Sequence, residues 1–94
     1  MPLFAVRYTY SPDTAPGRDD VRAAHRAWLR DLLEKGTVLS SGAFADGTGA
    51  LIIVSADDLD TTKTLFEQDP FAEASLVEDA AINEWLPVMG AFAD

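Results

Sequence analysis

The sequence predicts an α+β fold in which two helices cover one face of a four-stranded antiparallel sheet. Three observations support this prediction: a length of 94 residues, an alternation of strand-like and helix-like segments, and a clear hydrophobic periodicity in most of them. The segments follow in the order strand, helix, strand, strand, helix, strand, which makes two split β–α–β units. We therefore expect residues 1–94 to form a single ferredoxin-like domain.

The first unit comprises a strand and a long helix. Residues 3–10 are dense in β-branched and aromatic residues and are predicted to form a strand. Residues 11–18 hold two prolines and a glycine and are predicted to form a loop. Residues 19–35 have helical periodicity, with two aspartates at the start that suit the positive end of the helix dipole. Gly36 is a natural stop for this helix.

The second unit begins with two strands. Residues 37–44 and 50–56 are predicted strands, and an Asp-Gly pair between them is typical of a hairpin turn. The second of these strands is apolar on both faces, which favours a central place in the sheet. A second helix is predicted to run to about Gln68, and residues 76–88 are predicted to contain the last strand.

Both faces of the predicted sheet carry apolar residues, and the two predicted helices can cover only one of them. The run Ala50–Val54 and the tryptophan at position 85 place apolar residues on both faces of the predicted sheet. Two helices on one side leave the other side bare. We expect that side to be buried against a second copy of the chain, in a homodimer with two-fold symmetry.

Composition excludes several classes of function. Seven basic and sixteen acidic residues give a net charge of −9 and a pI near 4.2, which argues against binding to nucleic acid or to an anionic membrane surface. The chain has no cysteine, so disulfides, thiolate catalysis and cysteine-ligated zinc are excluded. No apolar stretch approaches the roughly 20 residues that span a bilayer, and the N-terminus lacks the basic region of a signal peptide. We expect a soluble cytoplasmic protein with a small-molecule ligand.

His25 is the only histidine, so imidazole chemistry has one possible place. With Val21 as zero on a helical wheel, His25 falls at about 40°, between Leu32 at about 20° and Leu29 at about 80°, in the middle of the apolar stripe. A hydrophobic residue would be expected there, because an unpaired buried ring nitrogen costs about 1–3 kcal/mol. Two interpretations stay open: a core histidine satisfied by a backbone carbonyl or a water, or a general acid–base group oriented by a carboxylate.

Asp69 is the candidate for that carboxylate. Most other acidic residues belong to helix starts or to solvated surfaces. Asp69 is expected at the C-terminus of the second helix, where the dipole disfavours a negative charge, and Pro70 directs it out of the helix. The alternative is an Asx-type turn that only ends the helix. No metal site is expected, because no spacing matches a calcium loop and one histidine cannot supply a zinc triad.

Two stretches resemble a known family. The segment HRAWLRDLLEKGTVLSSGAF, which begins at His25, and the segment LFEQDPF, which contains Asp69, are similar to the YciI-like (YCII-related domain) family. The resemblance implies a ferredoxin-like fold, dimers of the α/β-barrel type, and a pocket in which His25 and Asp69 form a His–Asp centre. The chain departs from the family pattern at Ala43, where members often have proline after glycine.

The resemblance implies proton-transfer chemistry, since one activity in the family is elimination of HCl from a chlorinated ring compound. Our first hypothesis is a cofactor-independent lyase or isomerase that acts on a small organic substrate, cyclic or halogenated, with His25 as base and then acid and Asp69 as its partner. Ser41 and the Gly42 amide are predicted to donate to a developing oxyanion. The predicted walls for an apolar ring are Tyr8, Trp28 and Phe71. The second hypothesis is a non-catalytic dimeric module that binds a small molecule or regulates a partner, in which His25 and Asp69 only join two helices.

Overall fold

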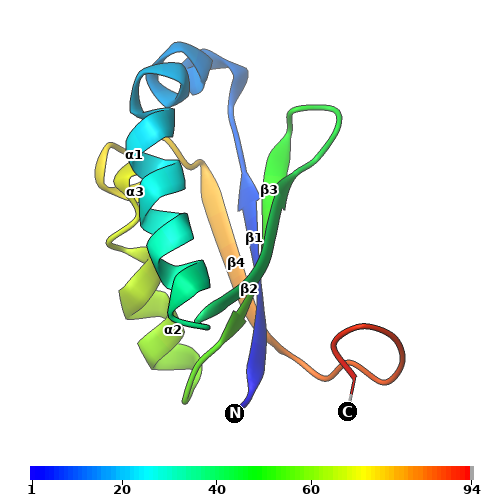
Figure 1. The fold of residues 1–94 in the computed structure, drawn as a ribbon. Coiled ribbons are helices and arrows are strands. Elements are labelled where there is room, and N and C mark those ends of the chain that lie inside the picture. The colour runs from blue at the N-terminus through cyan, green and yellow to red at the C-terminus, as the bar shows by residue number, and fades with distance from the viewer. Residues whose placement is uncertain (94) are drawn as a thin grey trace.

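The computed structural model describes residues 1–93 and has the predicted order of the main elements (Figure 1). Two short helices, η1 and α3, are additional to the prediction. The elements are β1 (Leu3–Thr9), η1 (Pro12–Thr14), α1 (Ala15–Glu34), β2 (Val38–Ala43), β3 (Gly49–Ser55), α2 (Leu59–Phe66), α3 (Pro70–Glu73) and β4 (Asp79–Trp85).

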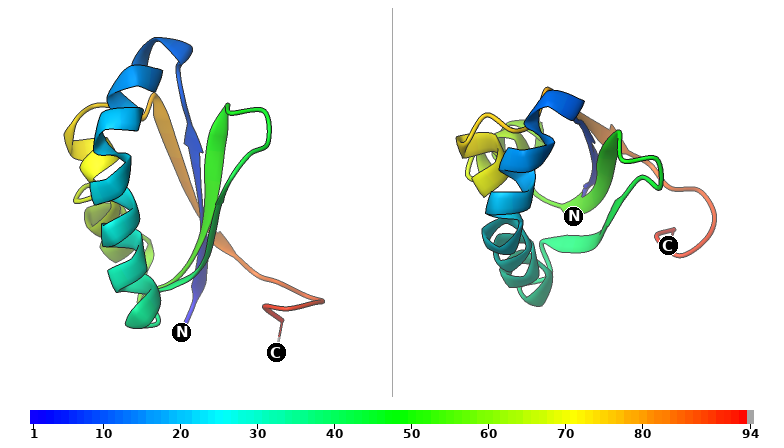
Figure 2. Two further views of the ribbon diagram at one scale, coloured as in Figure 1. Left: turned by 45° about the horizontal axis from the view of Figure 1, so that its top comes forward. Right: turned by 90° about the horizontal axis from the view of Figure 1, so that it is seen from above.

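The four strands form one sheet in the order β2-β3-β1-β4, and each neighbouring pair is antiparallel. The three α-helices all lie on one face of this sheet, with α1 beside β2 and α2 beside β4 (Figures 1 and 2). This is the predicted ferredoxin-like arrangement, with the two middle strands contributed by the two halves of the chain. The expectation that residues 50–56 form a central strand is confirmed by the position of β3 between β1 and β2.

The core lies between the sheet and the helices. Phe4, Val6 and Tyr8 alternate along β1 and are buried, as the period of two predicts. Val6 pairs with Ile52 and Tyr8 with Ala50 on β3. Close approach of the two strands at Tyr8 requires a glycine, because a Cβ on Gly49 would lie 1.9 Å from the Tyr8 carbonyl oxygen.

Helix α1 begins earlier than predicted. It starts at Ala15 rather than at position 19, so most of the segment 11–18 is η1 and the first turn of the helix. Pro16 is compatible with a first turn, where its missing N–H needs no partner and its fixed φ already fits. The predicted C-terminal stop is confirmed, since Gly36 follows the helix with φ of 81°.

The second helix and the last strand are shorter than predicted. Helix α2 ends at Phe66 rather than near Gln68, and a separate turn of helix, α3, begins at Pro70. The last strand covers Asp79–Trp85 rather than 76–88. Leu76 instead donates its N–H to the Phe71 carbonyl oxygen at 2.9 Å, which closes the turn after α3. Apolar composition alone could not separate this turn from the strand that follows.

The sheet face opposite the helices has no element upon it, apart from the segment after β4, which runs toward that side of the molecule (Figures 1 and 2). Trp85 packs edge-on against Phe92 of that segment, with ring centroids 5.9 Å apart. Leu51 and Trp85 keep 40% and 37% of their surface exposed on this face. Within residues 1–93 no helix combines the length and the apolarity needed to cross a membrane.

Candidate active site around His25 and Asp69

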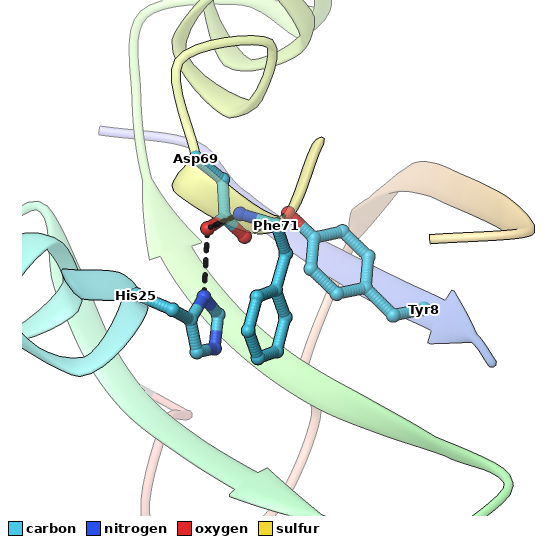
Figure 3. Close-up of polar contacts among 4 residues, drawn as sticks. All are labelled: Tyr8, His25, Asp69 and Phe71. Atoms are coloured by element: carbon cyan, nitrogen blue, oxygen red, sulfur yellow. Dashed lines mark hydrogen bonds and ion pairs between the residues drawn. The ribbon is translucent and has the colours of Figure 1, made fainter. Parts of the chain in front are cut away.

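His25 lies in the middle of α1 and is buried, with 8% of its surface exposed. The helical wheel predicted this burial, because His25 falls among the residues that face the sheet. Its Nδ1 lies 2.7 Å from Oδ1 of Asp69, which comes from the loop between α2 and α3 (Figure 3). The two residues are 44 positions apart in the sequence, and their contact depends on the packing of α1 against α3.

Asp69 is completely buried, and it caps a helix start rather than a helix end. Its Oδ1 accepts the N–H of Phe71 at 3.0 Å, which makes Asp69 the N-cap of α3. The expectation that Asp69 lies at the C-terminus of the second helix, where the helix dipole disfavours its negative charge, is therefore wrong. Pro70 ends one helix and also occupies the first turn of the next, where proline is favoured. The Asx-type turn and the contact with His25, which the sequence left as alternatives, occur together in the same carboxylate.

The hydrogen bonds around Asp69 fix the tautomer of His25. Three groups approach its two oxygens: the N–H of Phe71, Nδ1 of His25 and the hydroxyl of Tyr8. All three can donate at once only to an ionised carboxylate, which accepts and never donates. Nδ1 of His25 then carries a proton, and in the neutral form of the imidazole Nε2 holds the lone pair. Among residues 1–93 no buried side-chain nitrogen or oxygen lacks a partner, and Nε2 has no hydrogen bond there, so it reaches the cavity surface.

Tyr8 supports the carboxylate from the side opposite His25. Its hydroxyl donates to Oδ2 of Asp69 at 2.7 Å, from a side chain that is 1% exposed (Figure 3). Burial, followed by the negative charge of Asp69, raises the pKa of Tyr8 far above its usual range. The phenol therefore stays protonated and acts as a permanent donor. This arrangement anchors Asp69 to β1 at the same time as to α1 and α3.

Phe71 fixes the plane of the histidine ring. The two rings are stacked with centroids 3.8 Å apart and an angle of 5° between their planes (Figure 3). The backbone N–H of Phe71 binds Asp69 while its ring covers one face of His25, so one residue orients both members of the pair. The edge that bears Nε2 is left for a ligand in the cavity that His25 lines.

A cavity of about 300 Å³ lies beside His25, between α1 and the edge of the sheet. Four of the residues predicted for the site line it: His25, Ser41, Gly42 and Phe71. Tyr8 and Trp28 do not. Tyr8 lies behind Asp69, and Trp28 packs edge-on against Phe66 with centroids 5.2 Å apart. Their predicted role as walls for a substrate ring stays a prediction that this arrangement does not favour.

Sequence reasoning missed part of the lining. Arg22, Arg26 and Leu29 of α1 line the cavity together with His25, and none of the three was predicted for the site. The wheel offered a signal that was not used: Arg22 falls at about 100°, next to Leu29 at about 80°. A long side chain at the edge of an apolar stripe can extend its charged end toward the site. Tyr10, just past the end of β1, also lines the cavity and carries a raised pKa, because of burial and then of Asp69.

The titratable residues near the cavity are suited to proton transfer. Within residues 1–93 no three His, Asp or Glu side chains gather in a way that could hold a metal ion. The residues offer one imidazole nitrogen that has no hydrogen-bond partner among residues 1–93 and faces a small cavity, with a buried carboxylate behind the ring. Such a pair can take a proton from a bound molecule and keep the resulting imidazolium oriented.

Comparisons with known proteins agree with this fold. The profile of the YCII-related domain family matches residues 2–86. A solved structure of 5-chloro-2-hydroxyhydroquinone dehydrochlorinase (TftG) from Burkholderia phenoliruptrix AC1100, in complex with 2,5-dihydroxybenzoquinone, superimposes with a TM-score of 0.78 at 28% identity, over 88% of this chain and 92% of that one. Rv0793 from Mycobacterium tuberculosis superimposes with a TM-score of 0.57 at 16% identity, over 97% and 99% of the two chains, and shows the fold alone. No curated protein sequence matches the chain.

Proposed function

The chain belongs to the YCII-related domain family, and from that premise we propose that it is a cofactor-independent lyase- or isomerase-type enzyme that transfers a proton on a small ring compound. The observation that carries the proposal is the buried His25–Asp69 pair, 2.7 Å apart, with the free nitrogen of the imidazole facing a cavity. In this proposal His25 is the general base and then the general acid. Asp69 holds the tautomer and stabilises the imidazolium.

The halogenated substrate class rests on similarity to TftG, a dehydrochlorinase that aligns over most of both chains. In an elimination of HCl, Nε2 of His25 removes a proton from the ring compound. The electron pair of the broken bond to hydrogen moves into the ring, and chloride leaves with the electron pair of its bond to carbon. His25 then releases the proton to solvent, so the reaction balances without an oxidant or a cofactor. An isomerase would return the proton to another atom of the same molecule.

The cavity supports this chemistry with residues from two sides. Phe71, which is stacked on His25, also lines the cavity and gives it an aromatic wall. Ser41 and Gly42 line the opposite side, on β2, where a hydroxyl and a backbone amide could stabilise negative charge on a ring oxygen. Acid–base catalysis by one positioned side chain supplies about 10²- to 10⁴-fold, which suits an activated substrate of this kind.

The proposal includes a homodimer. Leu51 of β3 and Trp85 of β4 are exposed on the sheet face that no helix covers. A second copy related by a two-fold axis would bury this apolar surface against the same surface of its partner. Sedimentation of the protein at micromolar concentration measures this directly, and a stable monomer would contradict it.

The enzymatic proposal is tested by chloride release from 5-chloro-2-hydroxyhydroquinone, alongside a panel of halogenated phenols, lactones and enol acids. We expect turnover of at least one compound, with a loss of about 10²- to 10⁴-fold in His25→Gln and Asp69→Asn. Asp58→Asn is the matched control, since Asp58 is an exposed helix cap outside the cavity, and it should leave turnover unchanged. Circular dichroism establishes that each variant is folded. Variants that fold and turn over as fast as the wild type would refute the role of the pair.

A second function is favoured by one specific observation. The Asp69 carboxylate joins β1, α1 and α3 through its three hydrogen bonds, which would also suit a non-catalytic dimeric module. In that case the variants at His25 and Asp69 would lower stability, and no compound of the panel would be turned over by the wild type. Absence of turnover together with this loss of stability would favour the module over the enzyme.

A further inference from the structure

The charged side chains that line the cavity beside His25 are of the opposite sign to the net charge of the chain. The chain carries sixteen acidic and seven basic residues, yet the cavity is lined by Arg22 and Arg26 and by no acidic residue of the described chain. We propose that these two arginines bind an anionic oxygen substituent, a carboxylate or an ionised acidic hydroxyl, of a small ring compound held against His25. The proposal rests on the proposed function and names the class of its substrate.

The spacing on α1 places both guanidinium groups at the same opening. Arg22, His25, Arg26 and Leu29 follow at intervals of three, one and three, so all four can face one side of the helix, as their shared cavity requires. Two like charges four residues apart destabilise a helix by about 0.2–0.5 kcal/mol. An anion bound between them would remove this repulsion. The arrangement therefore costs stability in the empty protein and favours a negatively charged ligand.

Neither arginine is committed to the fold. Among residues 1–93 Arg22 pairs only with Asp19, across a contact in which the two side chains keep 39% and 69% of their surface exposed, and a contact of this kind contributes little to stability. Arg26 has no ion pair among residues 1–93, since the only other pairs there are His25–Asp69 and Lys35–Asp31. Both guanidinium groups can therefore turn to a ligand without breaking the structure.

Arg18 shows what a structural arginine looks like on the same helix. It is 5% exposed, donates to the carbonyl oxygens of Ser11 and Leu76, and lies over the ring of Tyr10 at 4.3 Å from its centroid. It joins η1 and the turn after α3 to the helix. The contrast separates one arginine that holds the fold from two that face the cavity.

The remaining lining limits the size and shape of the ligand. A cavity of about 300 Å³ is at the small end of the range for small-molecule sites. Leu29 and Phe71 offer apolar and aromatic surface for a ring, while the arginine fork matches the planar geometry of a carboxylate. An anionic substituent held by the arginines would keep the ring from rotating and present one of its protons to Nε2 of His25.

The test compares a charged probe with its neutral isostere. We expect 2,5-dihydroxybenzoate to bind more tightly than 2,5-dihydroxybenzamide, measured by calorimetry and by the NMR signals of the imidazole, which belong to His25 alone because it is the only histidine. Hydrogen bonds to charged groups are strong, so Arg22→Gln and Arg26→Gln should each lower the affinity for 2,5-dihydroxybenzoate by about tenfold or more. The double variant should lower this affinity by about a hundredfold. Binding of the amide should not change.

Arg30→Gln is the matched control. Arg30 is exposed, lies on the same helix and carries the same charge, and it lines a neighbouring depression, shared with Arg26, rather than the His25 cavity. This variant should bind both probes as the wild type does, and thermal unfolding verifies that all four variants are folded. Equal affinity of the wild type for acid and amide, or equal losses in Arg30→Gln and Arg26→Gln, would overturn the proposal.

The outcomes also separate this inference from the proposed function. Carboxylate binding that depends on Arg22 and Arg26, without turnover of any compound, supports the anion site and counts against the enzyme. Turnover that depends on His25 but keeps its KM in both arginine variants supports the enzyme and overturns the anion site.

Discussion

Helices α2 and α3 both begin with an aspartate, and the two aspartates have different consequences. Asp58 accepts the N–H of Thr61 at 2.7 Å, and Asp69 accepts the N–H of Phe71 at 3.0 Å. Asp58 is exposed, and its hydrogen bonds with Thr61 lower its pKa. Asp69 is completely buried and accepts two further hydrogen bonds, from His25 and Tyr8. The same local rule of helix capping produces a surface cap in one place and the support of a candidate active site in the other.

The difference arises from what surrounds each cap. The α2 start lies at the surface, where water can serve the free oxygen of Asp58. The α3 start is covered by α1 and by β1, so every donor that faces Asp69 depends on it alone. The comparison therefore predicts a graded series of effects, which begins with Asp69 and ends with Asp58.

The largest effect is expected from Asp69→Ala. It leaves three buried donors without an acceptor, at about 1–3 kcal/mol each, so the free energy of unfolding should fall by at least about 3 kcal/mol. Urea denaturation measures this change, with Asp58→Ala as the matched loss of a capping aspartate. If the two alanine variants lost equal stability, the distinction drawn between the two caps would be wrong.

A smaller effect is expected from Tyr8→Phe, which removes only the donor to Oδ2 of Asp69 and keeps the buried ring. One unsatisfied oxygen in a buried carboxylate should cost about 1–3 kcal/mol in the free energy of unfolding. Combining Tyr8→Phe with Asp69→Ala should cost no more than Asp69→Ala alone, because the hydrogen bond is already lost. Additive losses in this double-mutant cycle would show that the two side chains act independently.

Alkaline pH should act on the same hydrogen bond. The pKa of Tyr8 is raised in the folded protein, so folding favours the protonated phenol. The contribution of this group to the free energy of unfolding is fully present below the pKa of tyrosine in the unfolded chain, which is about 10. Above pH 10 the unfolded chain loses the phenol proton first, and stability should fall by about 1.4 kcal/mol per pH unit for this group. Chemical denaturation between pH 8 and about 11.5 should show a shallower fall in Tyr8→Phe. Tyr10, whose pKa is also raised, would account for the loss of stability that remains in this variant at high pH.

The smallest effect is expected from Asp58→Ala, which should lower the midpoint of thermal unfolding by a few degrees at most. The cap is exposed, so in the variant a water molecule can accept the N–H of Thr61 in place of Asp58. Its pKa is lowered in the folded protein, so its contribution is present above the unfolded pKa and is lost as pH falls through the folded value. The wild type and the variant should therefore converge in acid. A difference that persists in strong acid would point to another role for Asp58.

Much of the fold was accessible from local pattern. The dense β-branched and aromatic residues at 3–10 identified the first strand, and the period of 3.6 in α1 placed the buried His25 on the apolar stripe. The boundaries were less accessible. The α1 start at Ala15 and the turn Pro70–Glu73 depend on prolines, which are compatible with both a loop and the first turn of a helix.

The site was only partly accessible. His25 and Asp69 could be paired because one is a polar residue on an apolar stripe and the other an aspartate before proline, supported by a family resemblance. The tyrosine behind the carboxylate could not, since nothing in the sequence of β1 distinguishes Tyr8 from an ordinary core aromatic residue. Arg22 and Arg26 were not predicted for the site, although the helical wheel places Arg22 next to Leu29, because a wheel does not show how far a long side chain reaches.

The sequence by itself therefore determined the ferredoxin-like order of elements, the buried faces of the strands and the burial of its one histidine, because these follow from periodicities that neighbouring residues set. Only the tertiary structure decided that Asp69 caps a helix, binds His25 and accepts from Tyr8 at once, because β1, α1 and α3 meet there from distant parts of the chain. It also decided that two arginines of an acidic protein face the cavity beside that histidine. Contacts between residues 44 and 61 positions apart are set by packing, and no local pattern contains them.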